Sequence, residues 1–235
     1  MLSQTQLKTP GLNPLRIPFS QPFQPDPSCV LWLLAQQDGK WYDYSGKGNH
    51  GTITGASWKP TPAGPGLYFD GIDDYVNCRN DASLDIADAI TIMVWVKFHN
   101  PDSGAADRFF DITSSTQDWK AVFYNDDAWD NKRLYFTTYN ESGTREIISS
   151  SSDYLERNVW YYIVGTRDTS KIKLYVNGAV IDDGGASGSL APIGTATYIG
   201  NVINATITRA YIDSRAWTAA EIARVFEVER CWFGV

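Results

Sequence analysis

The chain of 235 residues is poor in cysteine, in clustered basic charge and in long apolar runs, and each shortage argues against a class of protein. Three cysteines are too few for a disulfide scaffold and have no metal-site spacing. A net charge of -7, with no block of Lys or Arg, argues against binding to nucleic acid or to an anionic membrane. No apolar stretch approaches the roughly 20 residues needed to span a bilayer, so we expect no membrane insertion.

The cysteines are expected to be reduced, because free cysteine commonly behaves as a small buried residue. A disulfide between Cys29 and Cys231 stays open as an alternative, since these two bracket the main part of the chain and chain ends often lie near each other. Residues 1–10 contain neither the basic region nor the apolar region of a secretory signal. We therefore expect synthesis in the cytoplasm, where disulfides are rare.

The first 27 residues differ from the rest by their density of proline and glutamine, which favours an extended conformation and cannot build a core. A disordered leader is one interpretation. The segment nevertheless contains apolar residues that a solvated tail does not need, namely Leu12, Leu15, Ile17, Phe19 and Phe23. We therefore predict that residues 1–27 form an arm that packs along a neighbouring subunit, and that residues 28–235 form one domain.

From Cys29 onward the pattern is that of many short strands separated by turns rich in Gly, Asp and Ser, which predicts an antiparallel β-sandwich. Lys171 to Val176 alternates, with Tyr175 on the outward side, and Asn177-Gly178 then predicts a type I′ hairpin turn. Thr218 and Glu221 form a capping box that predicts one short helix near the C-terminus. The other expected strands are 29–34, 67–69, 75–79, 90–98, 108–112, 120–124, 134–139, 145–149, 159–164, 197–201 and 207–212.

Two turn motifs carry a family resemblance: Asp43-Tyr44-Ser45-Gly46-Lys47-Gly48-Asn49-His50-Gly51, and Leu67-Tyr68-Phe69-Asp70-Gly71-Ile72-Asp73-Asp74-Tyr75-Val76. Their spacing resembles the opening of laminin-G-like and pentraxin-like domains of the concanavalin-A-like lectin and glucanase superfamily, and the resemblance extends over roughly residues 29 to 230. It implies an all-β, antiparallel jelly-roll sandwich with one short C-terminal helix. It implies the function less firmly, because the superfamily includes binding modules, enzymes and structural proteins.

The acidic turns are candidate metal sites, since relatives of this kind commonly hold calcium at loops of the sandwich. Hard oxygen donors suited to Ca²⁺ come from Asp43, Asn49, Asp70, Asp73 and Asp74. The alternative is turn chemistry, because Asp and Asn in turns often accept hydrogen bonds from their own backbone.

A second candidate site is the stretch from Gln117 to Asn131, where aromatic rings alternate with acidic and amide side chains. Sugars present apolar C–H faces and a rim of hydroxyls, so rings beside acceptors suit carbohydrate recognition. The predicted ligand-binding residues are Trp119, Tyr124, Asp126, Asp127 and Trp129. Packing against the core or against another subunit is the alternative role for these rings.

Catalysis is not expected. Retaining glucanases use two nearby carboxylates, in a Glu-x-Asp-x-x-Glu pattern on one strand. The nearest match here, Glu141 to Glu146, has Gly143 where the central Asp should be, and it spans an apparent turn. No nucleophile elbow or phosphate-binding glycine loop is found.

The sequence therefore leads to a non-catalytic structural or assembly protein, for example a virion decoration or fibre-associated subunit displayed on a particle, whose arm clasps a neighbouring subunit. The alternative is a calcium-assisted carbohydrate-binding module that recognises cell-surface glycans. A glycoside hydrolase is a distant third.

Overall fold

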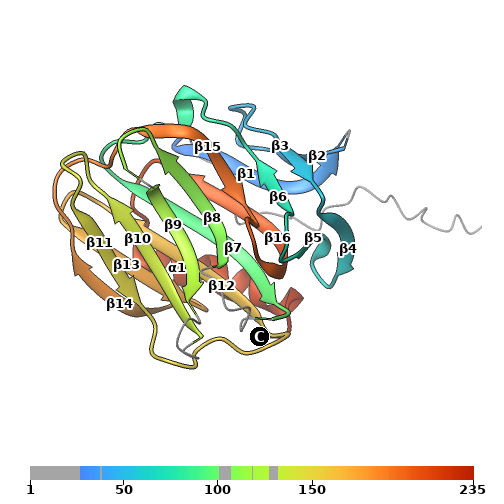
Figure 1. Cartoon of the computed structure of the whole chain (residues 1–235). Helices are drawn as coiled ribbons and strands as arrows, with labels where there is room; N and C mark the ends of the chain where they lie inside the picture. The colour runs from blue at the N-terminus through green and yellow to red at the C-terminus, as the bar shows by residue number, and fades with distance from the viewer. Residues whose placement is uncertain (1–26, 38, 101–106, 118, 127–131) are drawn as a thin grey trace, which may run out of the picture.

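The described residues of the computed structural model contain sixteen strands, all paired antiparallel, and one α-helix (Figure 1). They are residues 27–37, 39–100, 107–117, 119–126 and 132–235. The strands are β1 (Cys29–Gln37), β2 (Lys40–Asp43), β3 (Gly51–Thr54), β4 (Ser57–Thr61), β5 (Gly64–Asp70), β6 (Tyr75–Asn77), β7 (Ile90–Phe98), β8 (Asp107–Ser114), β9 (Trp119–Asp126), β10 (Arg133–Tyr139), β11 (Arg145–Ser149), β12 (Trp160–Arg167), β13 (Lys171–Val176), β14 (Ala179–Gly185), β15 (Ile193–Ile199) and β16 (Asn204–Asp213).

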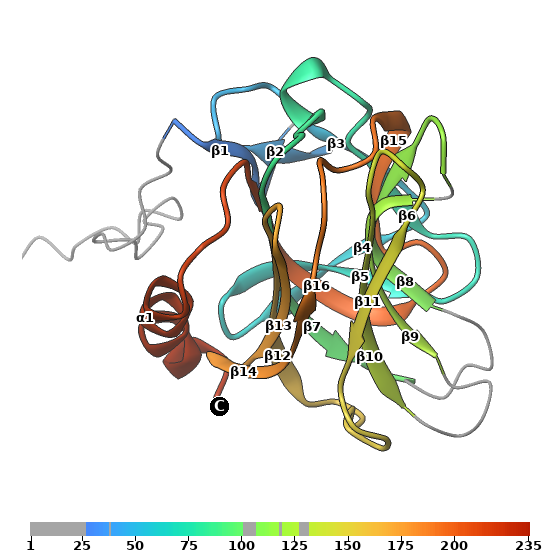
Figure 2. The same ribbon diagram turned by 90° about the vertical axis from the view of Figure 1, so that its left-hand side faces the viewer.

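The strands stack as two layers, which Figure 2 shows from the edge. The first layer has the order β11-β10-β9-β8-β15-β6-β3, and the second has the order β1-β16-β7-β12-β13-β14, with β5 and β4 attached to β16. β2 pairs with both β3 and β1 and so joins the layers at one edge. The predicted jelly-roll sandwich is confirmed.

The main core fills the space between the layers. Phe69, Phe98, Phe109 and Phe123 are fully buried there, together with the inward residues of most strands. Side chains alternate between the two faces of a strand. In the first layer, the residues before and after an inward residue therefore point to the outer face. This parity decides which side chains are offered to a ligand.

A second apolar cluster covers the outer face of the second layer, under α1 (Ala219–Glu229) and the C-terminal residues. Trp95 of β7 stacks on Phe233 with ring centroids 3.8 Å apart, and its indole nitrogen donates a 2.6 Å hydrogen bond to Glu229. Tyr175, expected to face outward, is only 2% exposed because it belongs to this cluster. Alternation correctly placed it opposite the main core, but could not reveal the helix that covers it.

Most local expectations are confirmed. Asn177 and Gly178 both have positive φ in the turn between β13 and β14, and the Thr218–Glu221 capping box opens α1. The sequence reading missed β2, β3 and β4, which are short and rich in polar residues or glycine, so that their apolar pattern is weak. The strand expected over 197–201 is shifted to Ile193–Ile199.

All three cysteines are free thiols, with Cys29 and Cys78 buried and Cys231 exposed. The alternative of a Cys29–Cys231 bridge is therefore wrong. Among the described residues, no helix has the length and hydropathy required to cross a bilayer.

Candidate functional site

The outer face of the first layer carries a group of aromatic side chains that we call the aromatic face. Phe123 and Phe136 lie in the core, so strand alternation directs their neighbours Tyr124 and Tyr135 outward. Trp119 has the same parity as Phe123, but a register shift in the β8–β9 pairing reverses its side, and its ring lies 6.5 Å from that of Tyr139. The only α-helix among the described residues lies on the opposite side of the sandwich, against the second layer (Figure 2). The aromatic face consists of Tyr75 of β6, Trp119 and Tyr124 of β9, Tyr135 and Tyr139 of β10, and Tyr198 of β15.

The rings of this face are ordered by contacts with one another. Tyr124 and Tyr135 are register partners on β9 and β10, and their rings stack with centroids 4.8 Å apart and planes 6° apart. Tyr75 and Tyr198 meet edge to face at 5.7 Å. Arg145 of β11 donates a 2.9 Å hydrogen bond to the Tyr124 hydroxyl, and burial raises the pKa of Tyr124. A face of prepositioned rings loses little conformational freedom when a ligand binds.

Charged groups lie among these rings. The Arg108 guanidinium sits 5.6 Å from the centre of the Trp119 ring, and its Nη1 lies 3.7 Å from Asp111 Oδ2 on the same strand. Asp111 is 3% exposed, and burial raises the pKa of its carboxyl to about 6, although the Arg108 cation opposes that rise. The face therefore combines apolar surface, a donor and an acceptor.

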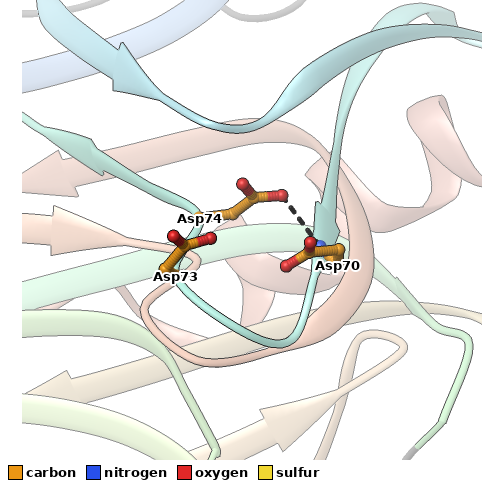
Figure 3. A group of neighbouring side chains, drawn as sticks. All are labelled: Asp70, Asp73 and Asp74. Atoms are coloured by element: carbon orange, nitrogen blue, oxygen red, sulfur yellow. Dashed lines mark hydrogen bonds between the residues drawn. The ribbon is translucent and has the colours of Figure 1, made fainter.

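The predicted metal ligands fall into two separate groups in the structure. Asp70, Asp73 and Asp74 come together in the turn between β5 and β6, where one carboxylate oxygen of each lies within 4.8 Å of the others (Figure 3). Asp74 Oδ2 accepts a 2.9 Å hydrogen bond from the Asp70 amide, and Asp70 Oδ1 accepts one of 2.8 Å from the amide of Ile72. Burial raises the pKa of Asp74, as do the charges of Asp70 and Asp73, while the Asp70 amide lowers it.

Gly55, at a φ of +71°, makes room for this acidic turn, because a Cβ there would collide with the Asp74 carboxylate. The three carboxylates are the oxygen donors that Ca²⁺ prefers, and they would supply part of its six to eight ligands. The residues thus fit a calcium ion in chemistry, while two of their oxygens already shape the turn.

Asp43 and Asn49 belong to the other turn, and their polar atoms are used within the fold. Asp43 Oδ1 accepts hydrogen bonds from the amides of Trp32 and Ser45, and Oδ2 accepts them from Ser45 Oγ and the Asn49 amide, all between 2.8 and 2.9 Å. Asn49 Nδ2 donates to the carbonyl of Val30 at 2.7 Å. This network ties the β2–β3 turn to β1, which is the turn chemistry that the sequence left open.

Of the predicted ligand-binding residues, the structure brings Trp119 and Tyr124 onto the aromatic face. The backbone of Asp126 ends β9, whereas Asp127 and Trp129 lie outside the described residues. The five apolar arm residues, between positions 12 and 23, also lie outside them.

The two glutamates nearest to a glucanase pattern have different environments. Glu146 is 6% exposed and is held by Arg167, whose Nε lies 3.0 Å from Glu146 Oε2. Glu141 is exposed on the turn before β11. Glu146 faces inward and so does not share a solvated face with Glu141 as an acid and nucleophile pair would.

A polar pocket of about 260 Å³ opens elsewhere, next to the β2–β3 turn, with Lys40, His50 and Arg79 in its lining. Among the described lining residues His50 provides the one ring, and that ring stacks on Tyr42 at 4.0 Å. The pocket offers less apolar surface to a sugar than the aromatic face does.

Comparison with known protein families shows which superfamily the chain belongs to. Residues 70–223 match the profile of the laminin-G-type family described as the concanavalin A-like lectin/glucanases superfamily. The chain belongs to this superfamily. The expected membership in this superfamily is thereby confirmed.

Relatives of this superfamily member include human pappalysin-1, which is 30% identical over 140 residues that make up 56% of this chain and 8% of that protein. Among solved structures, the binding domain of Paraclostridial Mosquitocidal Protein 1 superposes with a TM-score of 0.69 at 17% identity, covering 86% of this chain and 52% of that one. The botulinum neurotoxin serotype D ligand-binding domain in complex with N-acetylneuraminic acid gives a TM-score of 0.67 at 15% identity, covering 88% and 54%. The chain thus spans about half the length of these solved chains and a small part of pappalysin-1.

Sequence reasoning missed four rings of the aromatic face and the two charged residues among them: Tyr75, Tyr135, Tyr139 and Tyr198, with Arg108 and Asp111. A signal was present for two of them. In β10, Tyr135 and Tyr139 alternate with the buried Phe136, so one side of the strand is aromatic and hydroxylated. Arg108 and Asp111 share the outer face only because a β-bulge between Arg108 and Phe110 changes the parity of β8, and a bulge is not visible in a periodic pattern.

Proposed function

We propose that this chain is a non-catalytic carbohydrate-binding module and that the aromatic face holds the saccharide. One observation carries the proposal. Half-buried rings lie beside Arg108 and Asp111 on a sheet face that α1 leaves uncovered. Aromatic rings on an uncovered sheet face do not pack the core, and a group of exposed apolar side chains is typical of a binding site.

The chemistry of a pyranose suits this surface. Its C–H faces pack against Trp and Tyr rings, and its hydroxyls both donate and accept hydrogen bonds. Trp119, Tyr135 and Tyr139 are each partly exposed, so their rings are open to contact. Arg108 supplies donors and Asp111 an acceptor within the same face.

The relatives support this function over an assembly role. The superfamily is named for lectins and glucanases, and the solved structures named above are binding domains, one of them bound to N-acetylneuraminic acid. The burial of Glu146 against Arg167 favours a role without glycoside hydrolysis. The particle-assembly role depends on residues 1–27 and draws no support from these relatives.

Calcium is proposed as an accessory ligand of the β5–β6 turn, held by Asp70, Asp73 and Asp74. Its support is the convergence of the three carboxylates and the raised pKa of Asp74, which burial and its two acidic neighbours produce. A cation there would neutralise the mutual repulsion of the three carboxylates and so stabilise the turn.

The test is a glycan array probed with the full chain and with two variants. Trp119→Ala removes a ring of the aromatic face and should abolish the signal, whereas Tyr44→Ala removes a 38% exposed ring on the β2–β3 turn and should leave it unchanged. Circular dichroism establishes that both variants are folded. Absence of any signal from the unmodified chain, or equal signals from all three proteins, would contradict the proposal.

A further inference from the structure

Asp111 is a buried carboxylate whose hydrogen bonds are incomplete. Its Oδ1 has no hydrogen-bond partner among the described residues. Its Oδ2 lies 3.7 Å from Arg108 Nη1, which exceeds hydrogen-bond distance. Buried polar atoms are nearly always paired, because an unpaired one loses its hydration without replacement.

The surroundings of Asp111 do not supply the missing partner. The register places Val122 of β9 on one side of it and Tyr198 of β15 on the other. Arg108, on its own strand, is the one charged group among the described residues that acts on the Asp111 charge. The titratable groups described on the adjacent strands are Tyr198 of β15, Tyr124 opposite Arg108, and Lys120 of β9, whose Nζ is paired with Asp85 at 2.9 Å. Asp111 Oδ1 is therefore a buried, unpaired acceptor, on a residue that the register places between Val122 of β9 and Tyr198 of β15.

Arg108 also has open donors. Its guanidinium lies over Trp119 at 5.6 Å, and the one ion pair that it forms with a described residue is the loose pair with Asp111. A guanidinium carries five N–H donors and no acceptor, whereas a carboxylate only accepts. The group that satisfies both at once must accept from Arg108 and donate to Asp111, and a hydroxyl does both.

We propose that Arg108 and Asp111 form a subsite for a hydroxyl group of a neutral saccharide, and that ionised Asp111 is required to hold it, so that acidification releases the sugar. This inference rests on the proposed carbohydrate-binding function. A ligand carboxylate in the same place would meet the negative charge of Asp111, and like charges disfavour each other in a partly desolvated site. The subsite thus selects sugars by a neutral hydroxyl.

The pH range follows from the burial of Asp111, which raises the pKa of its carboxyl to about 6. At pH 7.5 the free protein has mostly ionised Asp111. At pH 5.0 only about one tenth of the molecules do, so binding should weaken about tenfold. Protonated Asp111 loses acceptor capacity and no longer attracts the donor that the subsite is built to receive.

The experiment probes an array of neutral and acidic glycans with the full chain at pH 7.5 and at pH 5.0, beside the Asp111→Asn variant. The unmodified chain should bind neutral glycans at pH 7.5 and lose about tenfold in apparent affinity at pH 5.0. Asp111→Asn should bind weakly and equally at both pH values, which assigns the pH effect to this residue rather than to other titrating groups.

Three outcomes would overturn the inference in distinguishable ways. Glycan binding by the unmodified chain that does not change with pH, or that changes identically in Asp111→Asn, defeats the subsite and leaves the proposed function intact. Binding confined to acidic glycans defeats the assignment of a neutral hydroxyl. No binding to any glycan at either pH defeats the proposed function and the subsite together.

Discussion

Arg167 and Glu146 form an ion pair withdrawn from solvent, with Nε 3.0 Å from Oε2 and a second contact of 3.2 Å between Nη2 and Oε1. Thr138 Oγ1 and the Ser187 amide also donate to Glu146, at 2.8 and 2.7 Å. Arg167 in turn donates to the carbonyls of Ser187 and Gly188. The pair joins β11 and β12, from opposite layers, to the segment that follows β14.

Breaking this pair from one side should be strongly destabilising. Glu146→Gln leaves the Arg167 cation buried without its counter-charge, which should lower the free energy of unfolding by about 3–5 kcal/mol. Urea denaturation measures the change. The double variant Glu146→Leu/Arg167→Met removes both charges and should recover much of that loss. A single variant as stable as the unmodified chain would contradict this account of Glu146.

Asp43 should prove to be a turn-forming residue. Asp43→Ala removes a carboxylate that accepts four hydrogen bonds, so we expect a loss of at least about 2 kcal/mol. Lys47→Ala, an exposed change in the same turn, serves as the control and should stay within about 0.5 kcal/mol. Chemical denaturation compares the two. Similar effects of both variants would show that the network contributes little.

Calcium binding is best tested at Asp73, because it is exposed and Asp70 and Asp74 also shape the turn. If the β5–β6 turn binds the ion, calcium should raise the melting temperature of the unmodified chain relative to chelator, since a ligand of the folded state stabilises it. Asp73→Asn should lose that increase and keep the melting temperature seen in chelator. Identical calorimetric scans of the unmodified chain with and without calcium would exclude the site.

Asp111 should destabilise the fold at neutral pH. Burial raises the pKa of its carboxyl from an ordinary 3.8 to about 6, so between these values the folded state retains a proton that the unfolded state has released. The free energy of unfolding therefore falls as pH rises through this window. Asp111→Asn should be more stable than the unmodified chain at pH 8, by up to about 3 kcal/mol.

The stability gain of Asp111→Asn should shrink toward pH 4, where the unmodified carboxyl is already protonated in the folded state. Thermal unfolding at pH 4, 6 and 8 measures the trend. A variant less stable than the unmodified chain by the same amount at every pH would show that Asp111 contributes hydrogen bonds instead of an uncompensated charge.

Much of the sandwich was predictable because its signals are local. The run Ile90 to Phe98, the turn at Asn177-Gly178 and the box from Thr218 to Glu221 each depend on residues a few positions apart. The candidate site was predictable only in part. Trp119 and Tyr124 were identified by composition, but their partners Arg108 and Asp111 come from a strand whose bulge decides which side they occupy.

The two acidic turns also show which features the sequence predicts and which only the tertiary structure decides. Both contain the residues of a calcium loop, and the sequence cannot separate them. The structure does, because the Asp43 carboxylate folds back onto the amides of its own turn and of β1, while Asp70, Asp73 and Asp74 converge on one another.

Alternation, turn residues and caps thus determined the strands, the hairpin and the helix, since each depends on the conformational preferences of neighbouring residues. Tertiary structure decided which strand face is covered by α1 and which is left open, because that depends on contacts between residues far apart in the chain. It also decided that Glu146 finds a buried counter-charge while Asp111 Oδ1 is buried without a partner among the described residues. Those pairings depend on distances of a few ångströms between strands, which no periodicity in the sequence encodes.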